Sequence, residues 1–120
     1  MRALVIDDDP AILTLVRKWL ERAGYEVLTS VDYADARTKL KEHQVDLVVA
    51  DIRLGEFNGL QLAARARQSG AHVVMMSGWS DDVLKAEAAR LGAVFLDKPF
   101  TEFEFSSAIG AQPETRPSAS

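Results

Sequence analysis

Short apolar runs alternate along this chain with longer stretches in which apolar residues recur at helical spacing. In the runs at 3–6 and 47–50, aliphatic and β-branched residues follow one another without polar alternation, which is typical of strands buried on both faces of a parallel sheet. The stretch 12–23 instead shows the apolar stripe of an amphipathic helix. Five strands are predicted, at 3–6, 25–29, 47–50, 72–76 and 93–96.

The alternation of strands and helices determines the expected architecture. The predicted strands end near residues 7, 29, 51, 77 and 97, and a helical stretch follows each of them. Successive strand–helix units with right-handed crossovers build a parallel sheet with helices on both faces. We therefore predict an α/β protein of the doubly wound, flavodoxin-like type, whose five-stranded parallel sheet has the order 2-1-3-4-5.

Local signals mark where the first and last helices begin. Asp9 precedes a proline, which is typical of an N-cap followed by the first residue of a helix. Thr101 and Glu104 have the spacing of a capping box, and Phe100 and Phe105 stand where a hydrophobic staple would place them. The last helix is predicted to be short.

The composition indicates one soluble globular domain, because 48% of the 120 residues are hydrophobic and 27% are charged. We assign this domain to residues 1–111 and expect 112–120, poor in apolar residues, to be a flexible tail or linker stub. The absence of cysteine excludes disulfides, thiolate metal sites and cysteine nucleophiles. No apolar run approaches the ~20 residues that cross a bilayer. A net charge of −4 gives no reason to expect nucleic-acid binding, and we expect a cytoplasmic protein.

Side chains that can do chemistry follow four of the predicted strands. Asp7 and Asp8 follow the first strand, Asp51 the third, Ser77 the fourth and Lys98 the fifth. In the predicted order the first and third strands are neighbours at the switch point of the sheet, so these side chains are expected to share one crevice. Three carboxylates in one crevice repel one another unless a cation joins them. Oxygen ligands without histidine or cysteine suit a hard cation such as Mg²⁺.

Such a group of side chains is suited to phosphoryl chemistry. A metal held by the acids would neutralise phosphoryl oxygens and leave Asp51 as a nucleophile toward phosphorus, forming an acyl phosphate. Lys98 would pair with another phosphoryl oxygen, and the Ser77 hydroxyl would donate a hydrogen bond. Taken singly, Asp51 and Ser77 could be turn residues and Lys98 a solvated surface lysine. Their joint occurrence at the strand ends favours the phosphoryl site.

Four segments carry a resemblance to a known family. They are Val-Ile-Asp-Asp-Asp-Pro at 5–10, Val-Val-Ala-Asp-Ile-Arg-Leu-Gly-Glu-Phe-Asn-Gly at 48–59, Met-Met-Ser-Gly at 75–78 and Phe-Leu-Asp-Lys-Pro-Phe at 95–100. In this order and at these spacings, they resemble the receiver domain of two-component response regulators, over roughly residues 1–110. The resemblance implies a phosphorylation-dependent signalling switch that is not an enzyme, apart from Mg²⁺-dependent phosphorylation and dephosphorylation of itself.

The resemblance implies a role for each acid of the site. Asp51 would be the phosphoacceptor. Asp7, Asp8, Asp51 and the backbone carbonyl of Arg53 would serve Mg²⁺, with Asp8 a direct ligand, and Mn²⁺ would be able to replace Mg²⁺. The phosphoryl donor would be a sensor histidine kinase or a phosphotransfer protein.

The resemblance also implies how the switch works. Ser77 and Lys98 would sense the phosphoryl group, and Phe95 would fill the space that Ser77 leaves when it moves inward. The face made by the fourth helix, fifth strand and fifth helix would then change and control an output domain or a separate effector. The chain would be a monomer or a phosphorylation-dependent dimer. The Lys98–Pro99 peptide bond would be cis.

Some positions depart from the family pattern or vary within it. Gly55 stands where the family often has proline, and Phe95 lacks the hydroxyl of a tyrosine. Arg53 and Trp79 occupy the variable positions that tune dephosphorylation in the family, two residues beyond the acceptor and two beyond Ser77. Our hypothesis is that these bulky groups hinder the attacking water and lengthen the phosphorylated lifetime.

Three other interpretations fit the sequence less well. A phosphohydrolase of the haloacid dehalogenase type also uses a strand-end aspartate and Mg²⁺. It requires a second acid two residues beyond the nucleophile, and this chain has Arg53 at that position. A flavodoxin-like cofactor binder would have a Ser/Thr-rich phosphate loop after the first strand, where this chain has acids. A degenerate receiver that serves only as an interaction module would lack some of the acceptor, acids, hydroxyl and lysine that are present here.

Overall fold

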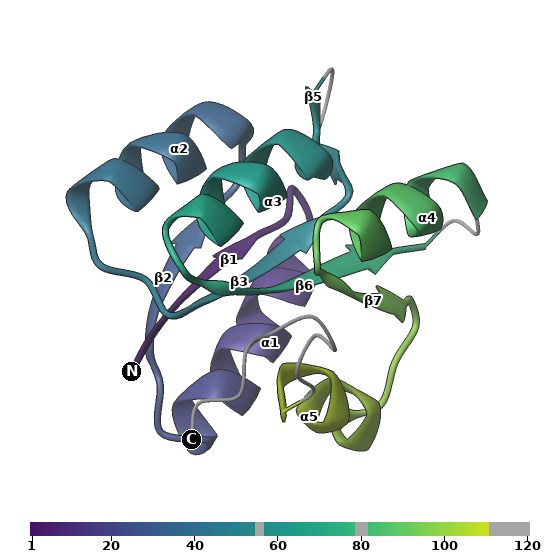
Figure 1. The fold of residues 1–120 in the computed structure, drawn as a ribbon. Coiled ribbons are helices and arrows are strands. Elements are labelled where there is room, and N and C mark those ends of the chain that lie inside the picture. The colour runs from purple at the N-terminus through teal and green to yellow at the C-terminus, as the bar shows by residue number, and fades with distance from the viewer. Residues whose placement is uncertain (55–56, 79–81, 111–120) are drawn as a thin grey trace, which may run out of the picture.

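The computed structural model of this chain describes residues 1–54, 57–78 and 82–110 (Figure 1). The strands are β1 (Arg2–Ile6), β2 (Glu26–Ser30), β3 (Leu47–Asp51), β4 (Arg53–Leu54), β5 (Phe57–Asn58), β6 (His72–Ser77) and β7 (Val94–Asp97). The helices are α1 (Pro10–Arg22), α2 (Tyr33–Glu42), α3 (Gly59–Gln68), α4 (Asp82–Arg90) and α5 (Glu102–Gly110). Gly55, Trp79 and the predicted tail at 112–120 lie outside the described residues.

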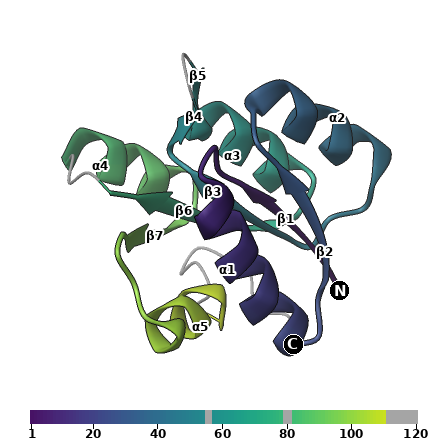
Figure 2. The same cartoon turned by 180° about the vertical axis from the view of Figure 1, so that it is seen from behind.

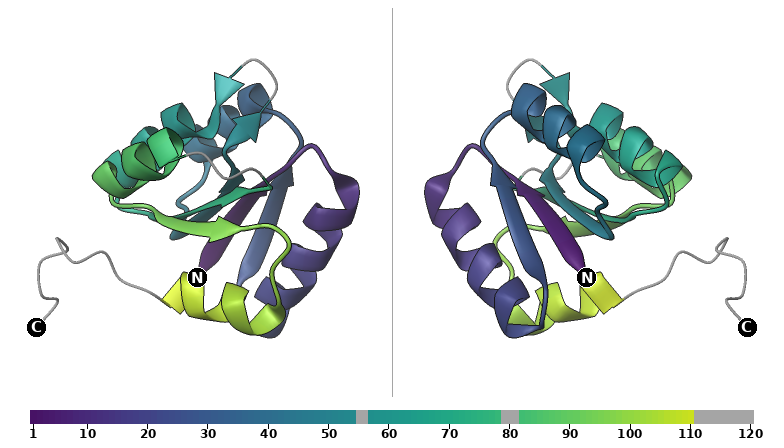
Figure 3. Two further views of the ribbon diagram at one scale, coloured as in Figure 1. Left: turned by 90° about the vertical axis from the view of Figure 1, so that its right-hand side faces the viewer. Right: turned by 90° about the vertical axis from the view of Figure 1, so that its left-hand side faces the viewer.

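Five parallel strands form one sheet in the order β2-β1-β3-β6-β7. Because β4 and β5 pair only with each other, these five strands are the first to fifth of the sheet in chain order, and the predicted order is confirmed. Helices α2, α3 and α4 cover one face, and α1 and α5 cover the other (Figure 1, Figure 2 and Figure 3). The doubly wound α/β architecture expected from the sequence is therefore observed.

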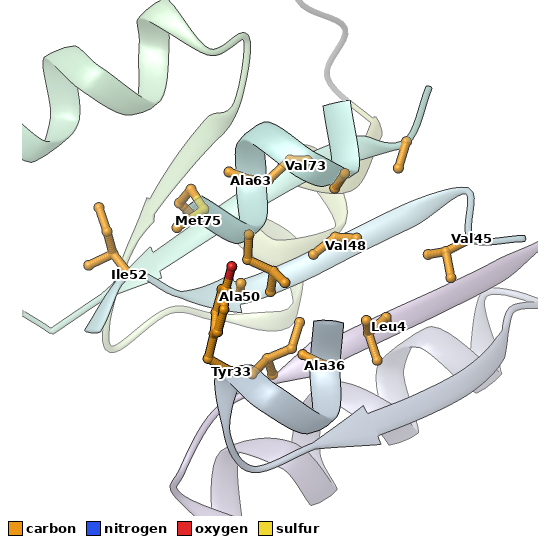
Figure 4. Close-up of a cluster of buried hydrophobic side chains, with 14 of the residues drawn as sticks. Leu4, Tyr33, Ala36, Val45, Val48, Ala50, Ile52, Ala63, Val73 and Met75 are labelled. Carbon is orange, nitrogen blue, oxygen red and sulfur yellow. The ribbon is translucent and has the colours of Figure 1, made fainter. Parts of the chain in front are cut away.

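Each face of the sheet has its own core, because successive residues of a strand point to opposite faces. In β3, Val48 and Ala50 pack under α2 and α3 (Figure 4), whereas Leu47 and Val49 pack toward α1 and α5. All four are buried. This explains why the sequence of the central strand is apolar at consecutive positions rather than at alternate ones.

A short antiparallel hairpin separates β3 from α3, where the sequence indicated only a loop. It consists of β4 and β5, with Arg53 opposite Asn58. Strands of two residues are too short to show an alternating pattern, so the hairpin could not be read from the sequence. Gly59 follows it, and its backbone N–H donates to the carbonyl of Ile52 at 2.6 Å. A Cβ at Gly59 would lie 2.6 Å from the carbonyl oxygen of Asp51, so only glycine fits beside the end of β3.

The predicted signals at the helix starts are confirmed. The Asp9 carboxylate accepts from the N–H of Ala11 at 2.9 Å at the start of α1. At the start of α5, Thr101 and Glu104 exchange the two hydrogen bonds of a capping box, at 2.8 and 3.1 Å.

Aromatic packing joins the start of α5 to α1. The rings of Phe100 and Phe105 stack with centroids 6.0 Å apart, and Trp19 of α1 lies 5.5 Å from Phe105. Arg22 of α1 and Glu102 of α5 form an exposed ion pair at 3.1 Å. Together these contacts fix α5 and the preceding loop, which carries Lys98, against α1. Among the described residues, none of the helices combines the length and apolar character that a membrane span requires.

Candidate functional site

The acids, the hydroxyl and the lysine predicted from the strand ends all lie at the carboxyl edge of the sheet. Asp7 follows β1, Asp51 ends β3, Ser77 ends β6 and Lys98 follows β7. Because the strands are parallel, their carboxyl ends lie at one edge, and β1 and β3 are neighbours there. One carboxylate oxygen each from Asp7, Asp8 and Asp51 lie within 4.8 Å of one another. The structure thus brings together the acids that the sequence placed in one crevice.

Lys98 links two of these acids. Its Nζ donates to Oδ2 of Asp7 at 2.7 Å and to Oδ2 of Asp51 at 3.0 Å. Asp7 is fully buried, while the side chains of Asp51 and Lys98 are 13% and 19% exposed. The three acids therefore differ in their exposure to solvent: Asp7 is buried, Asp51 is partly exposed and Asp8 is exposed.

Backbone N–H groups donate to the second carboxylate oxygen of Asp7 and of Asp51. The N–H of Asp9 donates to Oδ1 of Asp7, and the N–H of Arg53 donates to Oδ1 of Asp51, both at 2.9 Å. Each donor lies two residues beyond the acid that it contacts. The turns that follow β1 and β3 therefore orient the two carboxylates toward Lys98. The side chain of Arg53 is exposed.

Burial and hydrogen bonding shift the pKa values of Asp7 and Lys98 in opposite directions. Burial raises the pKa of the Asp7 carboxyl, although the hydrogen bonds from Lys98 and the N–H of Asp9 oppose the rise. Burial also disfavours the charged form of Lys98, but the hydrogen bonds that its ammonium donates to Asp7 and Asp51, together with their negative charge, outweigh burial and raise the pKa of Lys98. Lys98 is therefore held as a cation between the two acids.

Ser77 and Phe95 lie on the two neighbouring strands β6 and β7. Ser77 is buried, and its backbone carbonyl accepts from the N–H of Lys98 at 2.7 Å. Phe95 is half-buried and pairs in register with Met75. The Lys98–Pro99 bond is cis, as the resemblance implied. Trp79, the other predicted tuning residue, lies outside the described residues.

An apolar pocket of about 410 Å³ adjoins Lys98 on the side of α1, and the sequence did not predict it. Its lining includes Ile12 and Leu15 of α1 and Pro99 and Phe100 of the loop after β7. Leu15 is 39% exposed, although its position in the helical stripe indicated a core residue. The stripe is wider than the part of α1 that the sheet covers, so its edge remains open beside the site.

The donor set fits a divalent oxygen-binding cation. The oxygens of Asp7, Asp8 and Asp51 are hard ligands, and neither histidine nor cysteine belongs to the group. Three carboxylates and one ammonium leave two negative charges unbalanced when all four groups are ionised. A divalent cation would balance them, which is the physical reason to expect a metal at this edge.

Comparison with known proteins gives the family of the chain. The family model of the response regulator receiver domain matches residues 3–110. The alkaline phosphatase synthesis transcriptional regulatory protein PhoP of Bacillus subtilis (strain 168) is 31% identical over 113 residues. That alignment covers 92% of this chain and 47% of PhoP, so the chain spans about half the length of this relative.

Solved structures have the same fold. A receiver domain protein (CheY-like) from Methanospirillum hungatei JF-1 has a TM-score of 0.83 and 27% identity, covering 90% of this chain and 89% of that one. A response regulator from Burkholderia pseudomallei, solved with a phosphorylated aspartic acid, calcium ion and citrate, has a TM-score of 0.82 and 25% identity, covering 90% and 65%. This chain belongs to the response regulator receiver domain family, the signalling modules of two-component systems.

Proposed function

We propose that this receiver domain is a phosphorylation-dependent switch whose phosphoacceptor is Asp51. The observation that carries the proposal is the position of Lys98, whose ammonium bridges the buried Asp7 and the partly exposed Asp51. Of these two acids, Asp51 is the one that an incoming phosphorus can reach. The phosphorylated aspartic acid in the related Burkholderia pseudomallei structure supports the same chemistry.

In the proposed reaction, a carboxylate oxygen of Asp51 forms a bond to phosphorus while the bond from phosphorus to the imidazole nitrogen of a phosphohistidine breaks. The nitrogen keeps the electron pair of the broken bond, and Asp51 becomes an acyl phosphate. Lys98 would exchange its contact with the Asp51 carboxylate for one with a phosphoryl oxygen, and the Ser77 hydroxyl would donate to another. Attack of water on phosphorus would release phosphate and restore the carboxylate.

Mg²⁺ is the proposed cofactor, and Mn²⁺ could take its place. Asp7, Asp8, Asp51 and the backbone carbonyl of Arg53 would hold it. When bound, the ion would neutralise charge on the phosphoryl oxygens. The calcium ion in the related Burkholderia pseudomallei structure supports a divalent cation at this site.

Arg53 and Trp79 are proposed to set the lifetime of the phosphorylated form. The N–H of Arg53 contacts the Asp51 carboxylate, and its side chain is exposed beside that acid. A long side chain at this position would hinder water on its way to phosphorus. The same role for Trp79 rests on the resemblance alone.

The proposed partners are a histidine kinase or phosphotransfer protein as donor, and an output domain or separate effector as target. The apolar pocket at Ile12, Leu15, Pro99 and Phe100 lies beside Lys98, so a protein donor docked there would bring its phosphohistidine close to Asp51. Chains about twice as long, such as PhoP, support an output domain in the whole protein. We also retain the proposals that residues 1–111 form the domain and that the chain is a monomer or a phosphorylation-dependent dimer.

Incubation with Mg²⁺ and acetyl phosphate, followed by mass spectrometry of the intact protein, tests the proposal. The expected product carries one base-labile phosphate, which Asp51→Asn abolishes. Asp46→Asn is a matched control, because Asp46 lies just before the other end of β3 and its amide can still accept from the N–H of Arg2. Phosphate retained in Asp51→Asn would refute the assignment, and steady turnover of a small phosphate ester would favour a hydrolase.

A further inference from the structure

Lys85 of α4 contacts two residues of β7 at once. Its ammonium lies 5.2 Å from the centre of the Phe95 ring and 3.5 Å from a carboxylate oxygen of Asp97. Phe95 and Asp97 are two positions apart in β7, so their side chains point to the same face of the sheet, the face that α4 covers. Lys85 thus connects α4 to the edge strand of the sheet.

Ser77 lies on this same face. β6 and β7 are parallel, with Met75 opposite Phe95 and Ser77 opposite Asp97. Met75 belongs to the core under α4, and the half-buried Phe95 packs against that core. Ser77, two residues beyond Met75, points to the same face of the sheet. Lys85, Phe95 and Ser77 therefore share one layer between α4 and the sheet.

We propose that Lys85 is a positioning residue that holds the Phe95 ring in its resting place and so opposes activation. This inference rests on the proposed function and on the movement that the family resemblance implies, in which Phe95 fills the space that Ser77 leaves when Asp51 is phosphorylated. In this structure the Lys85 ammonium lies 5.2 Å from the centre of the ring, and we infer that a ring moving inward would lose this contact. The cation–π contact therefore stabilises the resting arrangement and not the active one, which is the differential interaction that a two-state bias requires.

The contact of Lys85 with the ring matters more than its ion pair with Asp97. The carboxylate of Asp97 is 61% exposed, and an exposed ion pair contributes little. A cation–π contact at a partly exposed site corresponds to a change of roughly two- to fivefold in a two-state equilibrium. The apparent affinity for a ligand that selects the active state changes by the same factor when that state is a minor one.

α4 keeps other anchors when the charge of Lys85 is removed. The guanidinium of Arg67 in α3 donates from Nε to the carbonyl of Leu91 at 3.2 Å, just after the end of α4. Ala88 is fully buried, and Leu84 packs against the core. Loss of the ammonium is therefore expected to release the Phe95 ring without unfolding the helix.

The test compares Lys85→Gln with wild type, Lys85→Arg and Lys41→Gln. Lys85→Arg keeps a cation over the ring, and Lys41→Gln removes the same charge from an exposed position on α2. Beryllofluoride with Mg²⁺, a phosphoryl mimic, is titrated into each protein, and the Phe95 ring resonances are followed by NMR in the free and bound forms.

We expect Lys85→Gln to lower the apparent dissociation constant roughly two- to fivefold. The Phe95 resonances of the free variant should shift toward their bound positions, while Lys85→Arg and Lys41→Gln behave as wild type. Wild-type affinity and unshifted resonances in Lys85→Gln, or weaker binding, would overturn the inference and leave the proposed function intact. If wild type itself binds no beryllofluoride, the proposed function and this inference both fail.

Discussion

Asp51→Asn is expected to stabilise the metal-free protein, although it removes a partner of Lys98. Asparagine has the shape of aspartate, and its carbonyl oxygen can still accept from Lys98 or from the N–H of Arg53. What changes is the charge, which Lys98 attracts and Asp7 and Asp8 repel. The sign of the effect depends on which of these terms is larger.

The distances decide between the two terms. At an effective dielectric constant of about 20, unit charges 3.0 Å apart, as in the pair of Asp51 with Lys98, attract by about 5.5 kcal/mol. Carboxylates no more than 4.8 Å apart repel by about 3.5 kcal/mol per pair or more, and Asp51 faces two of them. Because Asp8 is exposed, solvent weakens its repulsion of Asp51. The repulsion by both acids then exceeds the attraction by Lys98 only slightly, and we expect Asp51→Asn to be more stable than wild type by about 1 kcal/mol, or about 4 °C in Tm.

Thermal unfolding with EDTA and with Mg²⁺ measures this effect. Glu42→Gln, which removes one negative charge from an exposed position on α2, serves as the control and should have the Tm of wild type. Mg²⁺ should raise the Tm of wild type more than that of Asp51→Asn, because binding to the native state stabilises it according to affinity. A lower Tm for Asp51→Asn in EDTA, or an equal gain from Mg²⁺ in both proteins, would refute the electrostatic reasoning.

Three further outcomes are expected. Leu15→Asp places a charge in the apolar pocket beside Lys98, so it should slow transfer from a phosphorylated protein donor while labelling by acetyl phosphate stays at the wild-type rate; equal slowing of both would argue against docking there. Replacing Arg53 and Trp79 together by alanine should speed loss of the phosphoryl group, measured by its decay on the intact protein, and an unchanged rate would remove the shielding hypothesis. Hydrogen bonds from Lys39 and Ser30 lower the pKa of the Asp35 carboxyl below 3.8, so the stability that it contributes is fully present above pH 3.8 and is lost as pH falls through the lower folded value. NMR titration should show that midpoint below 3.8 and moving upward in Lys39→Met, and an unmoved midpoint would contradict the assigned cause.

The sheet and its edge could be predicted because their signals are local and strong. β1, β3, β6 and β7 each contain a continuous apolar run, since helices cover both faces of the sheet, and each of these runs ends at a polar residue where the chain leaves the core. The edge strand β2 has only Val27 and Leu28 in succession. Once the strand order is known, the chain positions of Asp7, Asp51 and Lys98 place them together without knowledge of their side-chain conformations. The capping box at Thr101 and Glu104 follows from spacing in the same way.

Other features depend on contacts between distant segments and leave no pattern in the sequence. Lys85 looks like an ordinary surface lysine until α4 is placed over β7, where its ammonium lies over the Phe95 ring. Leu15 looks like a core residue until the width of the sheet leaves it open beside Lys98. Each depends on how far one element extends over another, which residue periodicity does not encode.

The contacts of Lys98 connect the acids of the site to β7, and so indicate how phosphorylation of Asp51 would be coupled to Phe95. Its Nζ contacts Asp7 and Asp51, while its backbone N–H is bonded to the carbonyl of Ser77. Phe95 lies three residues earlier, on the strand that leads into Lys98 and under the ammonium of Lys85. In the proposed switch, a phosphoryl group takes Lys98 from Asp51 and draws Ser77 inward, so both movements act on the β6–β7 pair at its carboxyl end. Because the backbones of β6 and β7 are paired in register, we expect the response to lie in the side chains of Ser77 and Phe95, with the ammonium of Lys85 opposing the movement of the Phe95 ring.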